Sequence, residues 1–387
     1  MARWLLPEGI SDVLPHEARR VEELRRALLN LYASHGYQLV FPPLIEYLDS
    51  LLTGTGHDLD LRTFKLVDQL SGRQLGLRAD ITPQVARIDA HILNRAGVVR
   101  LCYAGSVLHT RPSHPLATRE PIQVGAELYG FAGLAADAEV QTLAVESLRT
   151  AGVPRIQIDL GHTGVVRAII AADAAATAAS EEILVALAAK DVPALKQVIA
   201  ETSTATAQAL LALTQLHGAS GIIDEARRSL PALPAIRRSL DDLAYLIERS
   251  TADVLSVDLS DLHGYRYYTG ANFAAYGSAE TNPQAAGALL RGGRYDDIGR
   301  AFGRARPATG FSLDLRDLAR RNGMRAVGSI LAPADDEPAL TALVAELRQR
   351  GQCVLRALDA SDAAPIDGVD RVIRKRDGVW RIEPVTG

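Results

Sequence analysis

The chain has 387 residues, of which 48% are hydrophobic and 23% charged, and a formal net charge of −4. This predicts a globular protein of two or three domains and excludes a long nucleic acid as an obvious partner, because phosphate binding needs a concentrated basic face. No run of 18 apolar residues escapes a charge or a helix breaker, so no membrane partner is expected. Cys102 and Cys353 show no C-x-x-C spacing, which predicts neither a metal site nor a disulfide framework, and the cytoplasm is the expected compartment.

The first 161 residues predict a mixture of helices and strands. Residues 15–35 read as an amphipathic helix, with Val21, Leu24 and Leu28 on one face and Pro15 in the first turn. The other elements expected here are a strand at 37–47 broken by two prolines, a hairpin at 62–78 with Ser71-Gly72 at its turn, strands at 98–110 and 120–131, a helix at 135–151 and a strand at 155–161.

Residues 165–250 are rich in alanine and leucine and carry helical spacing almost throughout, so they predict a helical insertion. Strands grouped on both sides of such a block favour an α+β fold with a mostly antiparallel sheet. The domains expected are a core at 1–325 and a small α/β domain at 326–387. The remaining elements expected are a strand at 253–262, a strand from 266 onward, a glycine-rich turn at 289–299, a strand and helix at 308–321, a strand at 326–332, a helix at 337–350, a strand at 352–358 and a hairpin turning at Asp377-Gly378.

The strand "IQVGAELYG" at 122–130 carries the most informative polar pattern. Because side chains alternate along a strand, Gln123, Gly125, Glu127 and Tyr129 share one face. The glycine would leave room for a ligand between an amide and a carboxylate. A sheet face open to water is an equally good reading of the same pattern.

The segment "SDLHGYRYYTGANF" at 260–273 contains two adjacent tyrosines. If a strand runs from 266 onward, Tyr267 and Tyr268 point to opposite faces, so at most one of them reaches any given pocket. Core aromatics with satisfied hydroxyl groups and a ligand-binding wall are both compatible with this stretch.

Two further stretches have ordinary structural readings. In "LRADITPQVAR" at 77–87, Asp80 or Thr82 is a candidate helix N-cap, and Asp80 could instead bind a cationic group. The basic run at 371–378 reads as a solvated strand or turn. Phosphate-binding glycine loops, the HExxH zinc motif and the G-x-S-x-G nucleophile motif do not occur, so no cofactor is predicted.

Over about residues 5–320 the chain resembles histidyl-tRNA synthetase, which has a class II synthetase fold. The resemblance implies an antiparallel sheet flanked by helices, with a helical insertion. Six segments carry it in fixed order: "LPEGISDVLP", "LRADITPQVAR", "YAGSVLHTRP", "REPIQVGAELYG", "LHGYRYYTG" and "GGRYDDIGRAFGRARPATGFSLDL".

The departures from that family decide the expected function. Where the family carries arginines for ATP and for the charge that develops during activation, this chain has His109, His263 and Asp317. Loss of one preorganised donor costs about 10²–10³ in rate, so three losses predict no amino-acid activation. Arg266 or Arg316 could compensate from neighbouring positions.

The amino-acid side of the family's pocket is better preserved. The resemblance implies that Asp80, Thr82 and Gln123 hold the α-amino group of histidine, and that Glu127 and Tyr268 contact its imidazole. Tyr295 lies on the same wall. Asp80 stands where the family has glutamate, and the ligand carboxylate lacks its expected arginine partners.

A synthetase-like core without these arginines, followed by about sixty residues, resembles the family of ATP phosphoribosyltransferase regulatory subunits. That resemblance implies a non-catalytic subunit that joins the short catalytic subunit, activates the first step of histidine biosynthesis and mediates feedback by histidine. It also implies a homodimer through residues 37–50 and no tRNA partner. The alternatives are an active histidyl-tRNA synthetase, a ligase acting on another acceptor, and a histidine sensor with some other partner.

Overall fold

The computed structural model describes residues 4–54, 57–112, 117–277, 287–321, 328–359 and 368–385. The chain divides into two compact units, residues 1–322 and 323–387, and each is described by itself. Among the described residues no helix is long and apolar enough to cross a membrane.

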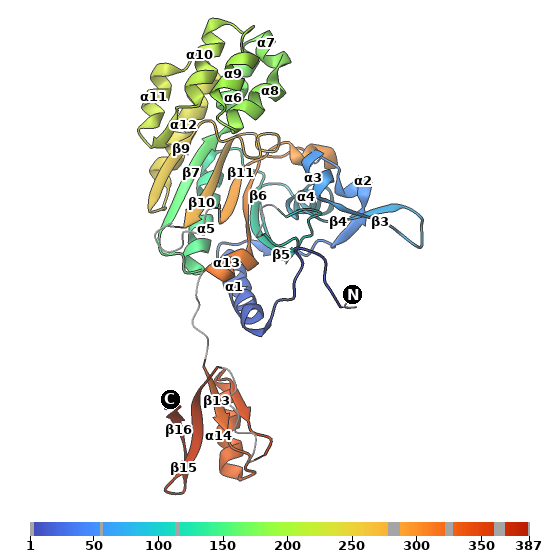
Figure 1. The fold of residues 1–387 in the computed structure, drawn as a ribbon, viewed down its shortest axis with the longest axis vertical. Coiled ribbons are helices and arrows are strands. Elements are labelled where there is room, and N and C mark those ends of the chain that lie inside the picture. The colour runs from blue at the N-terminus through green and yellow to red at the C-terminus, as the bar shows by residue number, and fades with distance from the viewer. Residues whose placement is uncertain are drawn as a thin grey trace. The chain divides into compact units, whose positions relative to one another are not determined.

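The larger unit is built on a nine-stranded sheet with strand order β1-β5-β6-β12-β11-β10-β7-β9-β8 (Figure 1). The pairs β1–β5 and β7–β9 are parallel and the other pairs are antiparallel, so the sheet is mixed, with a mainly antiparallel centre. Its strands are β1 (Gln38–Leu39), β5 (Val99–Ser106), β6 (Ile122–Tyr129), β7 (Ile156–His162), β8 (His217–Ala219), β9 (Val254–Asp258), β10 (Ala271–Gly277), β11 (Leu290–Arg294) and β12 (Ala308–Asp314). A separate small sheet pairs β2 (Ile45–Tyr47), β4 (Gln74–Leu77) and β3 (Phe64–Val67).

Helices cover both faces of the large sheet, and those of the insertion gather at one end of it (Figure 1). The helices outside the insertion are α1 (Pro15–Ser34), α2 (Leu48–Leu51), α3 (His57–Arg62), α4 (Thr82–Arg87), the π-helix η1 (Ile88–Leu93), α5 (Leu134–Thr150), the 3-10 helix η2 (Ile298–Phe302) and α13 (Leu315–Arg321). Those of the insertion are α6 (Thr163–Ala171), α7 (Ala174–Ala178), α8 (Ser180–Ala188), α9 (Val192–Val198), α10 (Thr204–Leu213), α11 (Ile222–Ser229) and α12 (Pro234–Arg249).

The two faces of β6 belong to two different apolar cores. Val124, Ala126 and Leu128 pack into a core with α1, α5 and the insertion. Tyr129, on the opposite face, packs with Tyr103 and Tyr295 into a smaller core under α4. The alternation predicted for this strand is therefore confirmed, and its polar face is covered, which makes the reading as a face open to water wrong.

Several elements of the larger unit differ from the sequence predictions. Residues 259–270 form turns and β10 begins only at Ala271, so the start predicted at 266 is wrong and the strand begins five residues later. The glycine-rich stretch predicted as a turn contains β11, a central strand, because Gly292 and Gly293 allow neighbouring strands to approach closely. The short strand β8 within the insertion was not predicted.

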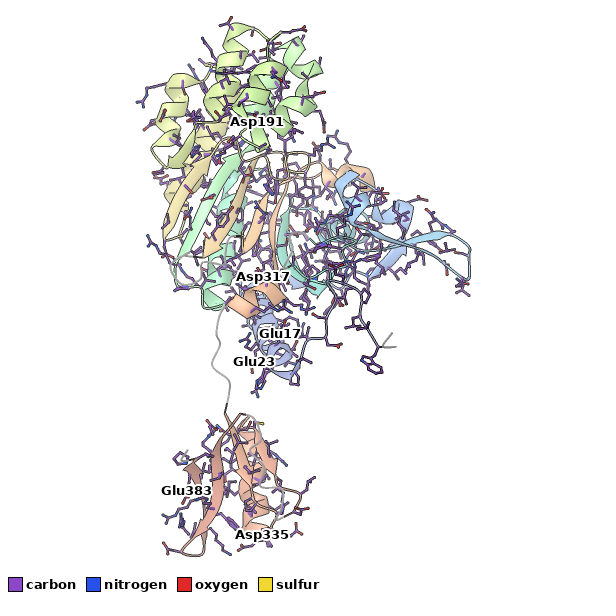
Figure 2. All side chains as sticks on the ribbon, viewed as in Figure 1. Glu17, Glu23, Asp191, Asp317, Asp335 and Glu383 are labelled. Atoms are coloured by element: carbon purple, nitrogen blue, oxygen red, sulfur yellow. The ribbon has the colours of Figure 1, made fainter. Side chains whose placement is uncertain are left out.

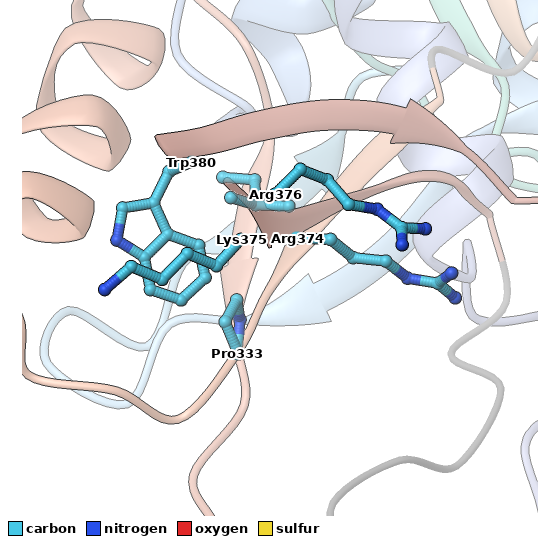
Figure 3. A pocket seen from close by; sticks show the side chains of 6 residues that line it. Pro333, Arg374, Lys375, Arg376 and Trp380 are labelled. Atoms are coloured by element: carbon cyan, nitrogen blue, oxygen red, sulfur yellow. The ribbon is translucent and has the colours of Figure 1, made fainter. Parts of the chain in front are cut away.

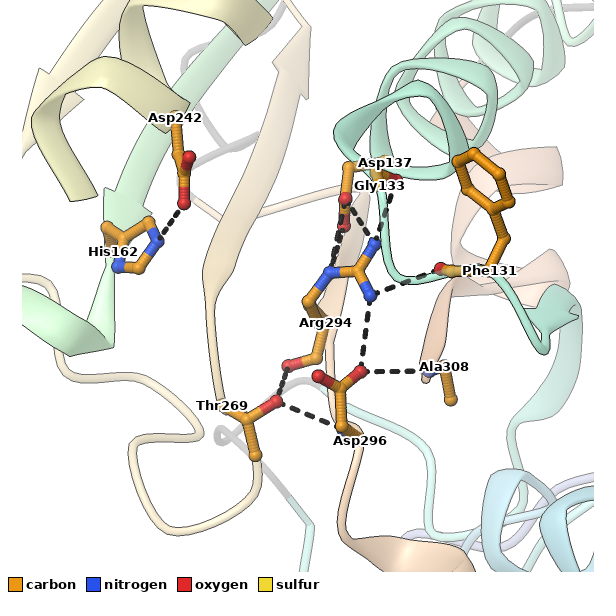
Figure 4. Close-up of polar contacts among 9 residues, drawn as sticks. All are labelled: Phe131, Gly133, Asp137, His162, Asp242, Thr269, Arg294, Asp296 and Ala308. Atoms are coloured by element: carbon orange, nitrogen blue, oxygen red, sulfur yellow. Dashed lines mark hydrogen bonds and ion pairs between the residues drawn. The ribbon is translucent and has the colours of Figure 1, made fainter. Parts of the chain in front are cut away.

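A buried ion pair fastens β11 to α5 (Figure 4). The guanidinium of Arg294 contacts the carboxylate of Asp137 at 2.5 Å and that of Asp296 at 3.2 Å, and its Nη1 also donates to the Phe131 carbonyl. The Asp296 carboxylate accepts the backbone N–H of Ala308 at 2.9 Å. These contacts fix the start of the segment that follows β11 and carries Tyr295.

The smaller unit is a four-stranded sheet with one described helix. Asp377 and Gly378, with φ angles of 50° and 78°, form the hairpin turn predicted for this region. A hollow of about 430 Å³ lies beside that hairpin and is lined in part by Pro333, Lys375 and Trp380 (Figure 3). The elements are β13 (Ser329–Ala332), α14 (Pro338–Gln349), β14 (Val354–Arg356), β15 (Val369–Arg376) and β16 (Val379–Pro384), in the sheet order β14-β13-β15-β16.

Candidate functional site

A buried carboxylate, Glu127, forms the centre of the candidate site. The side chain is 1% exposed and lies on the polar face of β6. Its Oε1 accepts hydrogen bonds from Tyr103 at 3.0 Å and from Thr82 at 3.1 Å. Its Oε2 accepts one from the hydroxyl of Tyr295. Three neighbouring elements, β5, α4 and the segment after β11, thus meet at one carboxylate.

Burial changes the protonation of this group. Removal from water raises the pKa of Glu127 to about 8, from an ordinary value near 4.5, although the hydrogen bonds from Tyr295 and Tyr103 oppose the shift. Burial, the charge of Glu127 and other neighbours raise the pKa of Tyr103 and of Tyr295 in turn. At neutral pH the site holds a carboxyl group close to its titration point, which suits reversible binding of a basic group.

A second polar cluster lies where β4 leads into α4. The Asp80 carboxylate accepts the side-chain amide of Gln123 at 2.8 Å and the backbone N–H of Thr82 at 3.0 Å. Gln123 Oε1 accepts the N–H of Ile81 at 2.8 Å. Ile81 stands directly before α4 and makes no side-chain cap, so the prediction of Thr82 as the cap residue is wrong. The alternative, Asp80, supplies the carboxylate that accepts an N–H group of the first turn.

Tyr268 borders the same core through its ring. Its ring lies 5.3 Å from that of Tyr267, and Tyr267 stacks on Tyr295 at 4.9 Å. Both adjacent tyrosines therefore pack against one cluster. The predicted alternation fails because the backbone turns here and does not extend. The structure thus brings together five of the six predicted histidine-pocket residues through hydrogen bonds, and the sixth, Tyr268, through packing.

Gly125 serves a different purpose from the one predicted. A Cβ added there would lie 2.5 Å from Cζ of Tyr103 and 2.6 Å from the carbonyl oxygen of Phe311. The space left by this glycine is therefore filled by the chain itself. Gly310 on β12 likewise makes room for the carboxylate of Glu127.

The three positions that differ from the synthetase pattern lie in different environments. His109 is buried, and burial together with the adjacent Arg62 lowers its pKa to about 4. His263 is 70% exposed, with its Nδ1 3.5 Å from the carboxylate of Asp261. Asp317 lies on α13, a helix that packs against α1, and Figure 2 labels both Asp317 and Glu17 of α1.

The two arginines that could compensate are bound elsewhere. Arg266 pairs with Glu181 on α8. Arg316 is 1% exposed, donates to Ser11 and to the carbonyl of Glu120, and lies 3.7 Å from Glu17. Neither guanidinium forms a contact with the pocket residues in the part of the chain that the structure describes.

Two site residues were missed by the sequence analysis. Tyr103 donates to Glu127 and lies directly across from Gly125 in the β5–β6 register, so a large residue facing a glycine was the available signal. Arg62 contacts His109 from α3, a helix that was not predicted, and no sequence pattern pointed to it.

Comparison with known proteins gives one consistent result. The family described as histidyl-tRNA synthetase matches residues 9–318, and the ATP phosphoribosyltransferase subunit HisZ C-terminal domain matches residues 327–383. The chain is 55% identical to the ATP phosphoribosyltransferase regulatory subunit of Burkholderia multivorans and 56% identical to that of Burkholderia vietnamiensis, over 99% of this chain and 100% of each relative.

Solved structures agree with that result. A regulatory subunit/histidyl-tRNA synthetase from Bacillus halodurans superposes with a TM-score of 0.83 at 25% identity, covering 96% of this chain and 97% of that one. The histidyl-tRNA synthetase of Nostoc sp. PCC 7120 shares the fold, with a TM-score of 0.77 at 18% identity over 97% of this chain and 92% of its own.

The state of Glu127 makes stability depend on pH. The pKa of Glu127 is raised in the folded protein. Its contribution to the free energy of unfolding is therefore fully present below about pH 4.5 and is lost as the pH rises through about 8. We expect the free energy of unfolding of Glu127→Gln, relative to the unsubstituted protein, to increase between pH 5 and pH 8 by up to about 1.4 kcal/mol per pH unit. Urea unfolding across that range measures it, and a constant difference would contradict the raised pKa.

Proposed function

This chain belongs to the family of ATP phosphoribosyltransferase regulatory subunits, and we propose that it activates the short-form catalytic subunit in the first step of histidine biosynthesis and transmits feedback by histidine. The observation that carries the proposal is identity of 55–56% with named regulatory subunits over essentially the whole chain. The match of the small unit to the C-terminal domain of such subunits supports it independently.

The proposal includes the absence of amino-acid activation. A triphosphate that reacts needs several fixed cations, since its charge grows and shifts in the transition state. A neutral buried imidazole at His109, an exposed one at His263 and an acid at Asp317 do not supply them. Arg62 contributes one guanidinium beside His109 and replaces at most one of the three arginines. We also propose that the chain uses no cofactor, has no tRNA partner and works in the cytoplasm.

The histidine ligand is proposed from the chemistry of the pocket residues. Asp80 and Gln123 offer oxygen acceptors suited to an ammonium group, and Glu127 with its tyrosines offers an acid and phenols suited to an imidazole. Histidine controls the enzyme only as far as its affinity differs between the active and the inhibited assembly. Its binding would replace contacts that Tyr295 and Thr82 make with Glu127 in the chain described here.

The homodimer is proposed from an exposed apolar surface within the predicted segment 37–50. We call it the 37–47 surface. Phe41 is 73% exposed, and the surface is apolar over several consecutive side chains, which is unusual for a surface in contact with water alone. Its other exposed apolar members are Leu39, Leu44, Ile45 and Tyr47.

Reconstitution tests the function. Mixing the chain with a short-form catalytic subunit should raise the rate of phosphoribosyl transfer to ATP, and added histidine should lower it. A rate indifferent to this chain would refute the assignment. Pyrophosphate exchange with histidine and ATP, measured on the chain alone, distinguishes an active synthetase from a regulatory subunit. A clear exchange rate would show that the chain activates the amino acid.

Histidine should stabilise the isolated chain if it uses this pocket. At 100 times its Kd the ligand adds about 2.7 kcal/mol to the free energy of unfolding. We expect Asp80→Ala and Glu127→Ala to abolish this gain, measured by denaturant titration with and without histidine. Asp297→Ala, at an exposed carboxylate paired with Arg300, should retain it. A full gain in the Asp80 and Glu127 variants would place the ligand elsewhere.

Placing a charge on the 37–47 surface should dissociate the dimer. Phe41→Asp introduces a carboxylate at its most exposed apolar side chain, and we expect sedimentation velocity to shift from dimer to monomer. Leu70→Asp is the matched control, because Leu70 is 98% exposed at the β3–β4 turn, outside the surface. A dimer that tolerates Phe41→Asp would exclude this interface.

A further inference from the structure

An arginine from α3 and a buried histidine form a pair beside the candidate pocket. Nη2 of Arg62 lies 3.2 Å from Nδ1 and 2.9 Å from Nε2 of His109. Nε2 of His109 is also 3.0 Å from the carbonyl oxygen of Ala79, the residue before Asp80. The backbone of His109 is fixed as well, since its carbonyl accepts Nε of Arg119 at 3.0 Å.

The geometry makes the imidazole an acceptor for the guanidinium. A carbonyl oxygen can only accept, so Nε2 of His109 carries the hydrogen that bonds to Ala79. Nδ1, 3.2 Å from Nη2 of Arg62, is then the ring nitrogen left to accept from the guanidinium, and the closer approach of Nη2 to Nε2 is a contact and not a hydrogen bond. The imidazole is 7% exposed and its low pKa keeps it neutral. A neutral acceptor orients an arginine without cancelling its charge, whereas a carboxylate would do both.

Other arginines of this unit are neutralised where they lie. Arg294 is paired with Asp137 and Arg306 with Asp89, both in buried contacts. For Arg62 the structure shows no carboxylate within ion-pair distance among the side chains it describes. Its side chain is exposed, so its remaining N–H groups can reach a ligand. An oriented guanidinium that keeps its charge is the arrangement that recognises a planar anion.

The position relative to Asp80 indicates which anion. The ammonium and carboxylate groups of an amino acid are attached to the same carbon, so their binding groups must be neighbours. His109 links Arg62 to Ala79 in two short contacts, and Asp80 follows directly. The negative charge of Asp80 is also close enough to affect the titration of His109. Arg62 is therefore at the end of the pocket where Asp80 is proposed to bind the ammonium group.

We propose that Arg62, oriented by His109, binds the α-carboxylate of the amino-acid ligand. This rests on the proposed histidine pocket and deepens it, because it supplies the partner that the carboxylate loses with the synthetase arginines. Two cations beside the hollow of the smaller unit differ from Arg62 because each is paired with a carboxylate. Lys375 pairs with Glu337 at 2.6 Å, and Arg376 pairs with Glu383 at 3.0 Å.

The test compares two ligands that differ in the carboxylate. Histamine has the imidazole and the amino group of histidine but lacks the carboxylate. Calorimetry on the full chain should show that L-histidine binds at least tenfold more tightly than histamine. In Arg62→Gln the preference should fall at least tenfold, with the Kd of histamine unchanged. Arg62→Lys should keep part of the preference. Arg73→Gln, at an exposed arginine over the ring of Tyr47, should keep all of it.

Each other outcome overturns the inference in a recognisable way. An Arg62→Gln chain that retains the full preference places the carboxylate on another group. AMP serves as a second probe, because it carries a phosphate. If Arg62→Gln weakens the binding of AMP and leaves the binding of histidine unchanged, the anion bound by Arg62 is a phosphate. Equal loss of histidine and histamine shows a structural role in shaping the pocket. If the unsubstituted chain binds no histidine, the proposed histidine pocket itself is refuted. That result is obtained without any variant, so it is distinguishable from a failure of the Arg62 proposal alone.

Discussion

The interior of the larger unit is organised around one carboxylate removed from water. Glu127 joins β6 to β5 through Tyr103, to α4 through Thr82 and to the segment after β11 through Tyr295. An unpaired buried carboxylate would be costly, so these three donors must stay in place, and Gly310 must leave space for the group. The requirement fixes the relative positions of β5, β6, α4 and Tyr295, and with them the polar cluster around Asp80 and Gln123.

The same scaffold explains how a synthetase-like core can have a regulatory function. The residues proposed to bind an amino acid differ from those at which the synthetase pattern places its nucleotide-binding arginines, so one set can change while the other is kept. Here the proposed binding residues are joined by hydrogen bonds and packing, and the positions of those arginines hold His109, His263 and Asp317 in three unrelated environments.

Local patterns predicted much of this fold, and their failures have physical reasons. The alternation of β6 and the Asp377-Gly378 turn depend on neighbouring residues, and both were predicted correctly. β11 was predicted as a turn because its two glycines reflect close packing of adjacent strands, which sequence does not reveal. The chain around Tyr267 turns where alternation predicted a strand. Arg62 was missed because its meaning depends on His109, 47 residues away.

Helix α4 joins the residues proposed to bind histidine to the 37–47 surface. Thr82 at its first turn contacts Glu127, while Gln84 donates to the Pro43 carbonyl and to Glu46, each at 2.8 Å, and Arg87 pairs with Glu46 at 2.5 Å. Because α4 is a short helix with side-chain contacts at both of its ends, a displacement at one end is passed to the other. In a symmetric dimer, ligand binding in one subunit would thus change the ligand affinity of the other subunit. The binding curve would then be steeper or shallower than a simple hyperbola.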